Sequence, residues 1–379
     1  MTLPLIRSTS FVSWRRAVVV ALILAAASAG LAPAQAAASP GWRIEQALPG
    51  ETVQNGLIFA TGKTNAWAVA SDNFGALDLV RWNGSTWQPV PTPANLGGNA
   101  VTAQALAGSN AHDMWLFSGS TADTWTGSEW SQQVLTGLDS GFGVTAAAVS
   151  GAGVWAFGAA PGKTEIGPPR ALRLTSGKWT TVAMPGLVLR VSEPSESDLW
   201  ALGTSRATEY RTINNWRMIL MHWAKGKWNA VSLSGARLSR GHPALALNFV
   251  ALGPSDVWAI AAATPNPCGC VAQPAGLLLE HWNGHRWTVT RLTGYRGVTG
   301  PVSDGHGGFW FVSQRGSDPF FVHVSNGKIA STAVPRSHGE YVSVDGLANI
   351  PGTRSVWASG SLAPHDGHGL EGVILKYGP

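Results

Sequence analysis

The segment from Ser255 to Val289 contains the unit that decides the fold. It opens with Ser255-Asp256-Val257-Trp258-Ala259-Ile260, a β-type run with a tryptophan near its centre. It closes with Leu278-Leu279-Glu280-His281-Trp282-Asn283-Gly284-His285-Arg286-Trp287-Thr288-Val289, two β-type runs joined by a tight turn, which predicts a hairpin. The same unit recurs along the chain, so we interpret the chain as copies of one piece of β-structure.

Each copy is expected to have four antiparallel strands, which we name A to D. The central tryptophan lies on strand B, an apolar run such as Val101 to Ala107 precedes it as strand A, and the hairpin supplies strands C and D. Four-stranded sheets that recur roughly every 40–60 residues are typical of the blades of a β-propeller. The central tryptophans are Trp67, Trp115, Trp155, Trp200, Trp258, Trp310 and Trp357, and the facing hairpin positions are Trp82/Trp87, Trp125/Trp130, Leu174/Trp179, Trp223/Trp228, Trp282/Trp287 and Val324/Ile329.

The hairpin turns come in two forms that fix the same register. Gly84-Ser85, with glycine first, suits a type II′ turn, and Asn326-Gly327 suits type I′. Both forms match the twist of antiparallel strands, so the two large residues of each hairpin should face each other on one side of the sheet.

The two ends of the repeat array complement each other. The seventh unit stops after Ile374 to Tyr377 without a strand D, whereas Gly41 to Glu45 resembles a strand D that has no blade of its own. We therefore predict that the N-terminal strand completes the last blade and closes the ring, which leaves no open sheet edges at a seam. The predicted fold is all-β, a single seven-bladed propeller over residues 39–379.

Residues 1–38 are expected to be a secretory signal peptide. Arg7, Arg15 and Arg16 form a basic start, Ala17 to Leu31 is apolar, and small residues at Ala34 to Ala38 offer cleavage sites. The adjacent arginines leave general secretory and twin-arginine export both open. We expect a secreted, extracellular monomer without a membrane span after cleavage.

Charge and cysteine content exclude several functions. The net charge of +5 includes the three arginines of the leader, so the remaining chain has a net charge of +2. This charge is too small to indicate nucleic-acid binding. Cys268 and Cys270 are candidates for a local disulfide in an oxidising compartment. The run from His365 to His368 has too few ligands for an ordinary structural metal site, and we predict no metal and no cofactor.

The repeats resemble the Trp-rich extracellular β-propellers of actinobacteria. That family repeats a Ser-x-Asp-Val-Trp-Ala-Val-Gly run, matched here by Ser197 to Gly203 and Ser255 to Ile260, and a Trp-Asn-Gly-x-x-Trp hairpin, matched by Trp82 to Trp87 and Trp282 to Trp287. The family is related more distantly to kelch, galactose-oxidase-like and Asp-box propellers. The resemblance implies the fold and carries no catalytic residues.

The strand order also predicts the face that carries a site. In such a meander the A–B and C–D turns lie on one face, and the B–C and D–A connections, which vary in length, gather on the other. We call that other face the variable-loop face; function commonly lies on loops that a rigid scaffold presents. The candidate binding residues there are Glu209, Tyr210, Arg211, Trp216, Arg217, Tyr295, Arg296, His338 and Tyr341.

The composition of these loops favours binding over catalysis. They combine aromatic and arginine side chains, and the chain contains none of the common catalytic motifs. The favoured function is a non-catalytic protein that binds an extracellular glycan, cell-wall component or protein. The alternative is a glycoside hydrolase or polysaccharide lyase with carboxylates at the channel mouth, drawn from scattered residues. The scattered carboxylates, which the sequence alone cannot pair across a ring, include Asp139, Glu165, Glu209, Asp304 and Glu340.

The repeat tryptophans have two interpretations. Indole rings stack on sugars, but a tryptophan in the middle of strand B should be wedged between neighbouring blades, where burial removes roughly 150–250 Å² of surface from water. We therefore assign the central tryptophans to the core, and leave the hairpin tryptophans open between core packing and ligand contact.

Overall fold

A computed structural model of the chain describes residues 41–379, apart from short internal segments. The segments outside the description are 73–74, 97–102, 137–141, 152, 162–165, 196, 205–217, 232, 234–236, 239–241, 244, 263–275, 338–339 and 363–370.

The described residues are almost entirely β-structure. A single 3-10 turn, η1, spans Ala94–Leu96. The strands are β1 (Trp42–Pro49), β2 (Glu51–Gly62), β3 (Asn65–Asp72), β4 (Leu77–Trp82), β5 (Trp87–Val90), β6 (Ala105–Asn110), β7 (Asp113–Ser118), β8 (Thr121–Trp125), β9 (Trp130–Val134), β10 (Gly143–Ser150), β11 (Gly153–Pro161), β12 (Ile166–Thr175), β13 (Lys178–Ala183), β14 (Leu187–Ser195), β15 (Asp198–Thr204), β16 (Met218–Ala224), β17 (Lys227–Val231), β18 (Arg237–Leu238), β19 (His242–Pro243), β20 (Leu245–Gly253), β21 (Asp256–Ala262), β22 (Leu277–Trp282), β23 (Trp287–Leu292), β24 (Arg296–Ser303), β25 (Phe309–Arg315), β26 (Asp318–Ser325), β27 (Lys328–Ala333), β28 (Val342–Asn349), β29 (Val356–Leu362) and β30 (Glu371–Tyr377).

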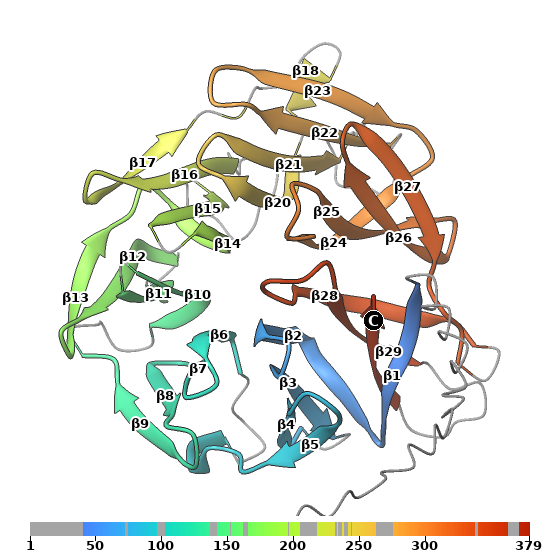
Figure 1. Cartoon of the computed structure of the whole chain (residues 1–379). Coiled ribbons are helices and arrows are strands. Elements are labelled where there is room, and N and C mark those ends of the chain that lie inside the picture. Colours follow the sequence, from blue (N-terminus) through green and yellow to red (C-terminus); the bar gives the residue numbers. More distant parts are fainter. Residues whose placement is uncertain are drawn as a thin grey trace, which may run out of the picture. The chain divides into compact units, whose positions relative to one another are not determined.

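These strands form seven four-stranded antiparallel sheets, and β18 pairs with β19 as a separate two-stranded ribbon. Blades 1 to 6 begin with β2, β6, β10, β14, β20 and β24, and each continues through the next three strands of its sheet. Blade 7 has the order β1-β30-β29-β28. Figure 1 shows the sheets following one another around a centre, with strand A of each blade innermost. The predicted seven-bladed propeller is confirmed.

The N-terminal strand closes the ring. β1 pairs antiparallel with β30, and Trp42 lies opposite Tyr377. The Trp42 ring also stacks on Phe321 of blade 6 with 3.6 Å between ring centroids, and meets Trp310 edge-on at 5.6 Å. Trp42 therefore joins blades 6 and 7 as well as completing the sheet, and the predicted closure is confirmed.

The hairpin register follows from the turns. Trp82 lies opposite Trp87, and Val324 lies opposite Ile329, as predicted. Asn326 and Gly327 have φ of 51° and 71°, which is the type I′ conformation, and Gly84 has φ of 105°, as a type II′ turn requires.

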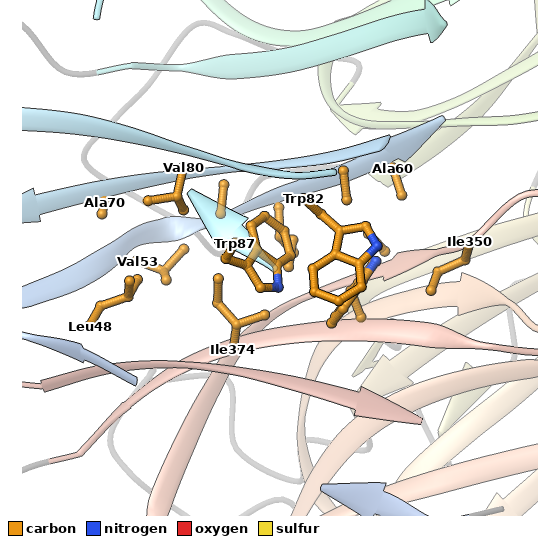
Figure 2. Packing of buried hydrophobic residues seen from close by; sticks show 14 residues of the cluster. Leu48, Val53, Ala60, Ala70, Val80, Trp82, Trp87, Ile350 and Ile374 are labelled. Atoms are coloured by element: carbon orange, nitrogen blue, oxygen red, sulfur yellow. The ribbon is translucent and has the colours of Figure 1, made fainter. Parts of the chain in front are cut away.

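The repeat tryptophans form the interfaces between blades. Of the seven central ones, all are buried except Trp258, which is half-buried. At the junction of blades 7 and 1, Trp357 meets both Trp82 and Trp87 edge-on at 5.1 Å. Figure 2 shows this cluster, with Ile374 of β30 directed towards Trp87 of β5. Here the hairpin tryptophans belong to the core.

In most blades the innermost strand contains a bulge at the same position relative to the central tryptophan of strand B. The ladder between strands A and B shifts register between Val144 and Ala146 in blade 3, between Val188 and Arg190 in blade 4, and between Val344 and Gly346 in blade 7. A bulge inserts one extra residue and re-aims a side chain. In blade 7 the extra residue is Asp345.

Candidate functional site

The central channel is a cavity of about 1090 Å³ that all seven innermost strands line. Its described lining is polar and aliphatic, with two charged side chains, Arg190 of blade 4 and Asp345 of blade 7. Burial lowers the pKa of Arg190, whose Nη1 donates to the Leu189 carbonyl at 2.8 Å. Burial raises the pKa of Asp345. The channel therefore presents one cation and one carboxyl group on different blades.

Glu193 lies on the same innermost strand as Arg190. Burial raises its pKa to about 8, and a hydrogen bond from the Val149 N–H to Oε1, at 3.0 Å, favours the ionised form but offsets only part of that rise. The carboxyl thus joins β14 to β10 of the preceding blade, and a large fraction of it is protonated at neutral pH.

Glu193→Gln should stabilise the protein at alkaline pH. The folded state holds a proton that the unfolded chain releases above about pH 4.5, so the stability of the native protein falls as pH rises from there to about pH 8. The amide oxygen of glutamine can still accept the hydrogen bond from the Val149 N–H, but glutamine cannot ionise. Urea unfolding should show the two proteins alike at pH 4 and the variant more stable at pH 9, by on the order of 1–3 kcal/mol.

Glu129→Gln is the control for this titration. Glu129 is an exposed side chain in the C–D turn of blade 2, and surface changes of this kind cost within about 0.5 kcal/mol. If Glu193→Gln gave no larger difference at pH 9 than at pH 4, the enclosed carboxyl would have no part in the pH dependence.

A second cavity, which we call the lateral pocket, lies between blades 6 and 7. Its volume is about 400 Å³, within the range of about 300–1,000 Å³ typical of ligand sites. The lining comes from the first residues of β24 and β28, the last residues of β25 and β29, and the β25–β26 turn. Because these are the ends that adjoin the B–C and D–A connections, the pocket opens on the variable-loop face.

The lateral pocket and the channel share part of their lining. Val298, Thr299, Asp345 and Ser361 border both cavities. The other polar lining groups of the pocket are hydroxyls and one amide, from Ser313, Gln314, Ser317, Tyr341 and Ser343. Asp345 is the one charged side chain among the described residues of the pocket lining. The two cavities adjoin each other at these residues, and we refer to them together as the groove.

Tyr341 is the sequence-predicted residue that lines the lateral pocket. Its side chain is 47% exposed, its hydroxyl accepts a hydrogen bond of 2.6 Å from Arg336, and the guanidinium lies 4.1 Å from the ring centroid. This cation–π contact holds the ring at the edge of the pocket.

Tyr295 and Arg296 lie next to the pocket without lining it. Tyr295 packs edge-on against Phe320 at 5.3 Å, and Arg315 covers its ring at 5.0 Å. Arg296 is the first residue of β24, immediately before Gly297 of the lining. Their role in binding stays a prediction. Glu209, Tyr210, Arg211, Trp216, Arg217, His338, Cys268 and Cys270 lie outside the described residues.

The scattered carboxylates do not converge where they are described. Asp304 lies in the A–B turn of blade 6, between β24 and β25, on the face opposite the variable loops. Its burial would raise the pKa, but hydrogen bonds from the His323 ring and from the His306 and Gly308 N–H groups lower it. Glu340 forms a β-bridge with Ser337 in the connection between blades 6 and 7.

A column of Arg, His and Lys side chains on strand C was not predicted from the sequence. The residue opposite the central tryptophan is Arg, His or Lys in six of the seven blades. In blade 5, for example, His281 stacks on Trp258 at 4.0 Å, and Asp256 bonds both the His281 ring at 2.8 Å and the Trp258 indole N–H at 3.0 Å. The six residues are Arg81, Arg173, His222, His281, His323 and Lys376.

The sequence carried a signal for this column. Five of the six residues come directly before the first facing position of their hairpin, as His281 precedes Trp282. In blade 7, Lys376 comes directly before Tyr377, which faces Trp42 of the closing strand. The side chains are already engaged with an indole ring, and in blades 4 to 6 with an aspartate, so the column stabilises the blades.

Solved structures with the same fold are distant in sequence. The structure described as "YCF48 bound to D1 peptide" has a TM-score of 0.56 and 13% identity, covering 89% of this chain and 97% of that chain. YCF48 from Cyanidioschyzon merolae has a TM-score of 0.55 and 16% identity, covering 89% of this chain and 99% of that chain. A complex of BBS1N with ARL6DN gives 0.52 and 10%, covering 89% and 97%. No family model and no curated protein sequence matches the chain.

The fold, the closing strand and these comparisons define the class: the chain is a seven-bladed β-propeller. At such identities the likeness shows the fold alone, and the resemblance to the Trp-rich actinobacterial propellers stays a prediction. Within the described ranges, no helix has the length and apolarity to cross a bilayer. In the same ranges, no three His, Cys, Asp or Glu side chains are grouped as metal ligands would be.

Proposed function

We propose that this propeller is a secreted, non-catalytic binding protein, of the Trp-rich extracellular kind, that recognises an extracellular ligand on its variable-loop face. The observation that carries the proposal is the groove formed by the lateral pocket and the channel. A preformed cavity on the predicted face, with hydroxyl, amide and carboxyl groups around an aliphatic lining, has the composition of a recognition site.

The geometry supports binding over glycoside hydrolysis. Hydrolysis of a glycosidic bond usually takes a pair of carboxyl groups about 5–10 Å apart. Among the described residues that line the two cavities, Asp345 is the one carboxyl group. A protein of similar fold, YCF48, has been solved bound to the D1 peptide, which supports ligand capture by such a scaffold.

Filling the lateral pocket should weaken ligand binding. Ser343 lines the pocket, and among the described residues its exposed hydroxyl hydrogen-bonds to Ser361 alone, at 2.9 Å between the two Oγ atoms. Ser343→Trp introduces an indole into a 400 Å³ space and should weaken binding at least tenfold without lowering the melting temperature. The measurement is a screen of the full chain against peptide, glycan and cell-wall panels, followed by titration of each binder.

Ser331→Trp is the matched control. Ser331 is exposed on β27, the outermost strand of blade 6, and that variant should keep full affinity. If the native protein and Ser343→Trp bound the ligand equally well, the lateral pocket could not be the binding site. A native protein that captured nothing on any of the three panels would contradict the proposed function itself.

A further inference from the structure

The lateral pocket contains a carboxyl group that has no partner among the residues the structure describes. Asp345 is the extra residue of the β28 bulge, and it borders both the pocket and the channel. Among the described residues the structure gives its side chain no hydrogen bond and no ion pair. The side chain is exposed to the water of the cavities, and its partial enclosure raises its pKa. A carboxylate that has no described partner and lines a cavity is available to pair with a cation that a ligand brings.

The protein's own neighbouring cations are engaged elsewhere. Arg336, at the edge of the pocket, donates to the Tyr341 hydroxyl and covers its ring. Arg190, the other charged group of the channel, belongs to blade 4 and donates to its own strand at Leu189. A cation for Asp345 therefore has to come from the ligand.

Main-chain groups line the pocket on both sides. β28 is the innermost strand of its sheet, so one of its edges has no partner strand, and Tyr341 to Asp345 on that strand and its start line the pocket. On the other side, β24 pairs with β25 at Arg296 and Thr299 but leaves Gly297 and Val298 out of register. A free strand edge offers alternating N–H and C=O groups, which recognise an extended peptide by strand addition.

We propose that the groove binds an extended peptide segment that carries a lysine or arginine, with its main chain along the free edge of β28 and its cation at Asp345. The inference rests on the proposed binding function and names the ligand class. A peptide is favoured over a glycan because the site joins a strand edge to a single carboxylate. The surrounding hydroxyls of Thr299, Ser317 and Ser343 complete a polar wall that suits a main chain.

The test uses the native protein and an acetylated, amidated hexapeptide library with one position fixed as Lys, Arg, norleucine or Glu. Lysine and arginine peptides should bind at least tenfold more tightly than the matching norleucine peptides, because a charge-assisted hydrogen bond is lost in the latter. This difference in affinity should shrink as the salt concentration is raised from about 50 mM to about 1 M. Since the comparison uses only native protein, it holds even where a variant misfolds.

Asp345→Asn, titrated with the same peptides, should reduce the Lys-to-norleucine preference from tenfold or more to about one. Asp318→Asn is the matched control, because Asp318 is exposed on the same face and does not line the pocket. Equal affinity for lysine and norleucine peptides, or a preference retained in Asp345→Asn, overturns the inference and leaves the binding function standing. Capture of oligosaccharides without any peptide would overturn it in favour of a glycan ligand, whereas no capture at all would remove the proposed function as well.

Discussion

Trp42→Ala is expected to destabilise the protein by about 3–5 kcal/mol, the cost typical of truncating a large buried aromatic. Trp42 is 9% exposed, and it contacts three aromatic rings that belong to two blades: Phe321 and Trp310 of blade 6, and Tyr377 of blade 7. The variant thus removes the stacking that joins the N-terminal strand to two blades at once, and it leaves a cavity where blades 6 and 7 meet.

The measurement is equilibrium unfolding in urea followed by far-ultraviolet circular dichroism, with Trp179→Ala as the control. Trp179 faces Leu174 from strand D of blade 3, as Trp42 faces Tyr377 in blade 7, but it is half-buried and meets Trp115 edge-on at 6.0 Å. Its truncation should cost at most about 2 kcal/mol. Equal losses in the two variants would mean that the first strand closes the ring through backbone pairing alone, without help from the aromatic stack.

The architecture was predictable because it is fixed by short-range features. A two-residue turn sets the register of each hairpin, so Trp82 and Trp87 have to face each other. Closure followed from counting strands, because an unpaired strand D at one end matched a missing one at the other. The opposition of Trp42 and Tyr377 is the outcome of that count.

The candidate site was harder to predict from the sequence because it forms between two blades. Val298 and Asp345 meet at one pocket although they lie on different blades, and no spacing within a single repeat indicates which two blades separate to form a cavity. The sequence directed attention to the variable loops, where Tyr341 does line the pocket, but it missed Asp345 inside a strand. An Asp-Gly pair within an apolar run was the available signal, since a bulge re-aims a side chain that regular alternation would have placed differently.

The bulges of strand A also require a small residue on strand B, three residues after the central tryptophan. It is glycine in blades 3, 4 and 7, at Gly158, Gly203 and Gly360. A Cβ atom on any of the three would overlap a carbonyl oxygen of the neighbouring strand A, which for Gly203 is that of Leu187. The backbone at Gly203 needs no left-handed φ, so the requirement is close approach of two strands.

Gly203→Ala should therefore destabilise the protein by at least about 3 kcal/mol, at the upper end of the cost of overpacking a core. The obstacle is backbone: Gly203 lies opposite Val188 immediately before the register shift, so relief requires β14 to move away from β15. The Cε of Met221, 3.0 Å from the new methyl group, limits movement on the other side. In blade 5 the equivalent residue is Ala261, which lies opposite Ala246 immediately before that blade's own register shift.

Gly253→Ala is the matched control for this prediction. Gly253 ends β20 of blade 5, its φ is not left-handed, and a Cβ built there meets no atom within 4 Å. Its replacement should be neutral or stabilise by up to about 1 kcal/mol, because alanine lowers the entropy of the unfolded chain. Thermal and urea unfolding of the two variants separate the explanations. If both were tolerated alike, the innermost strands would be able to shift outwards without loss, and the bulges that place Asp345 and Arg190 in the channel could not be rigid features of the blades.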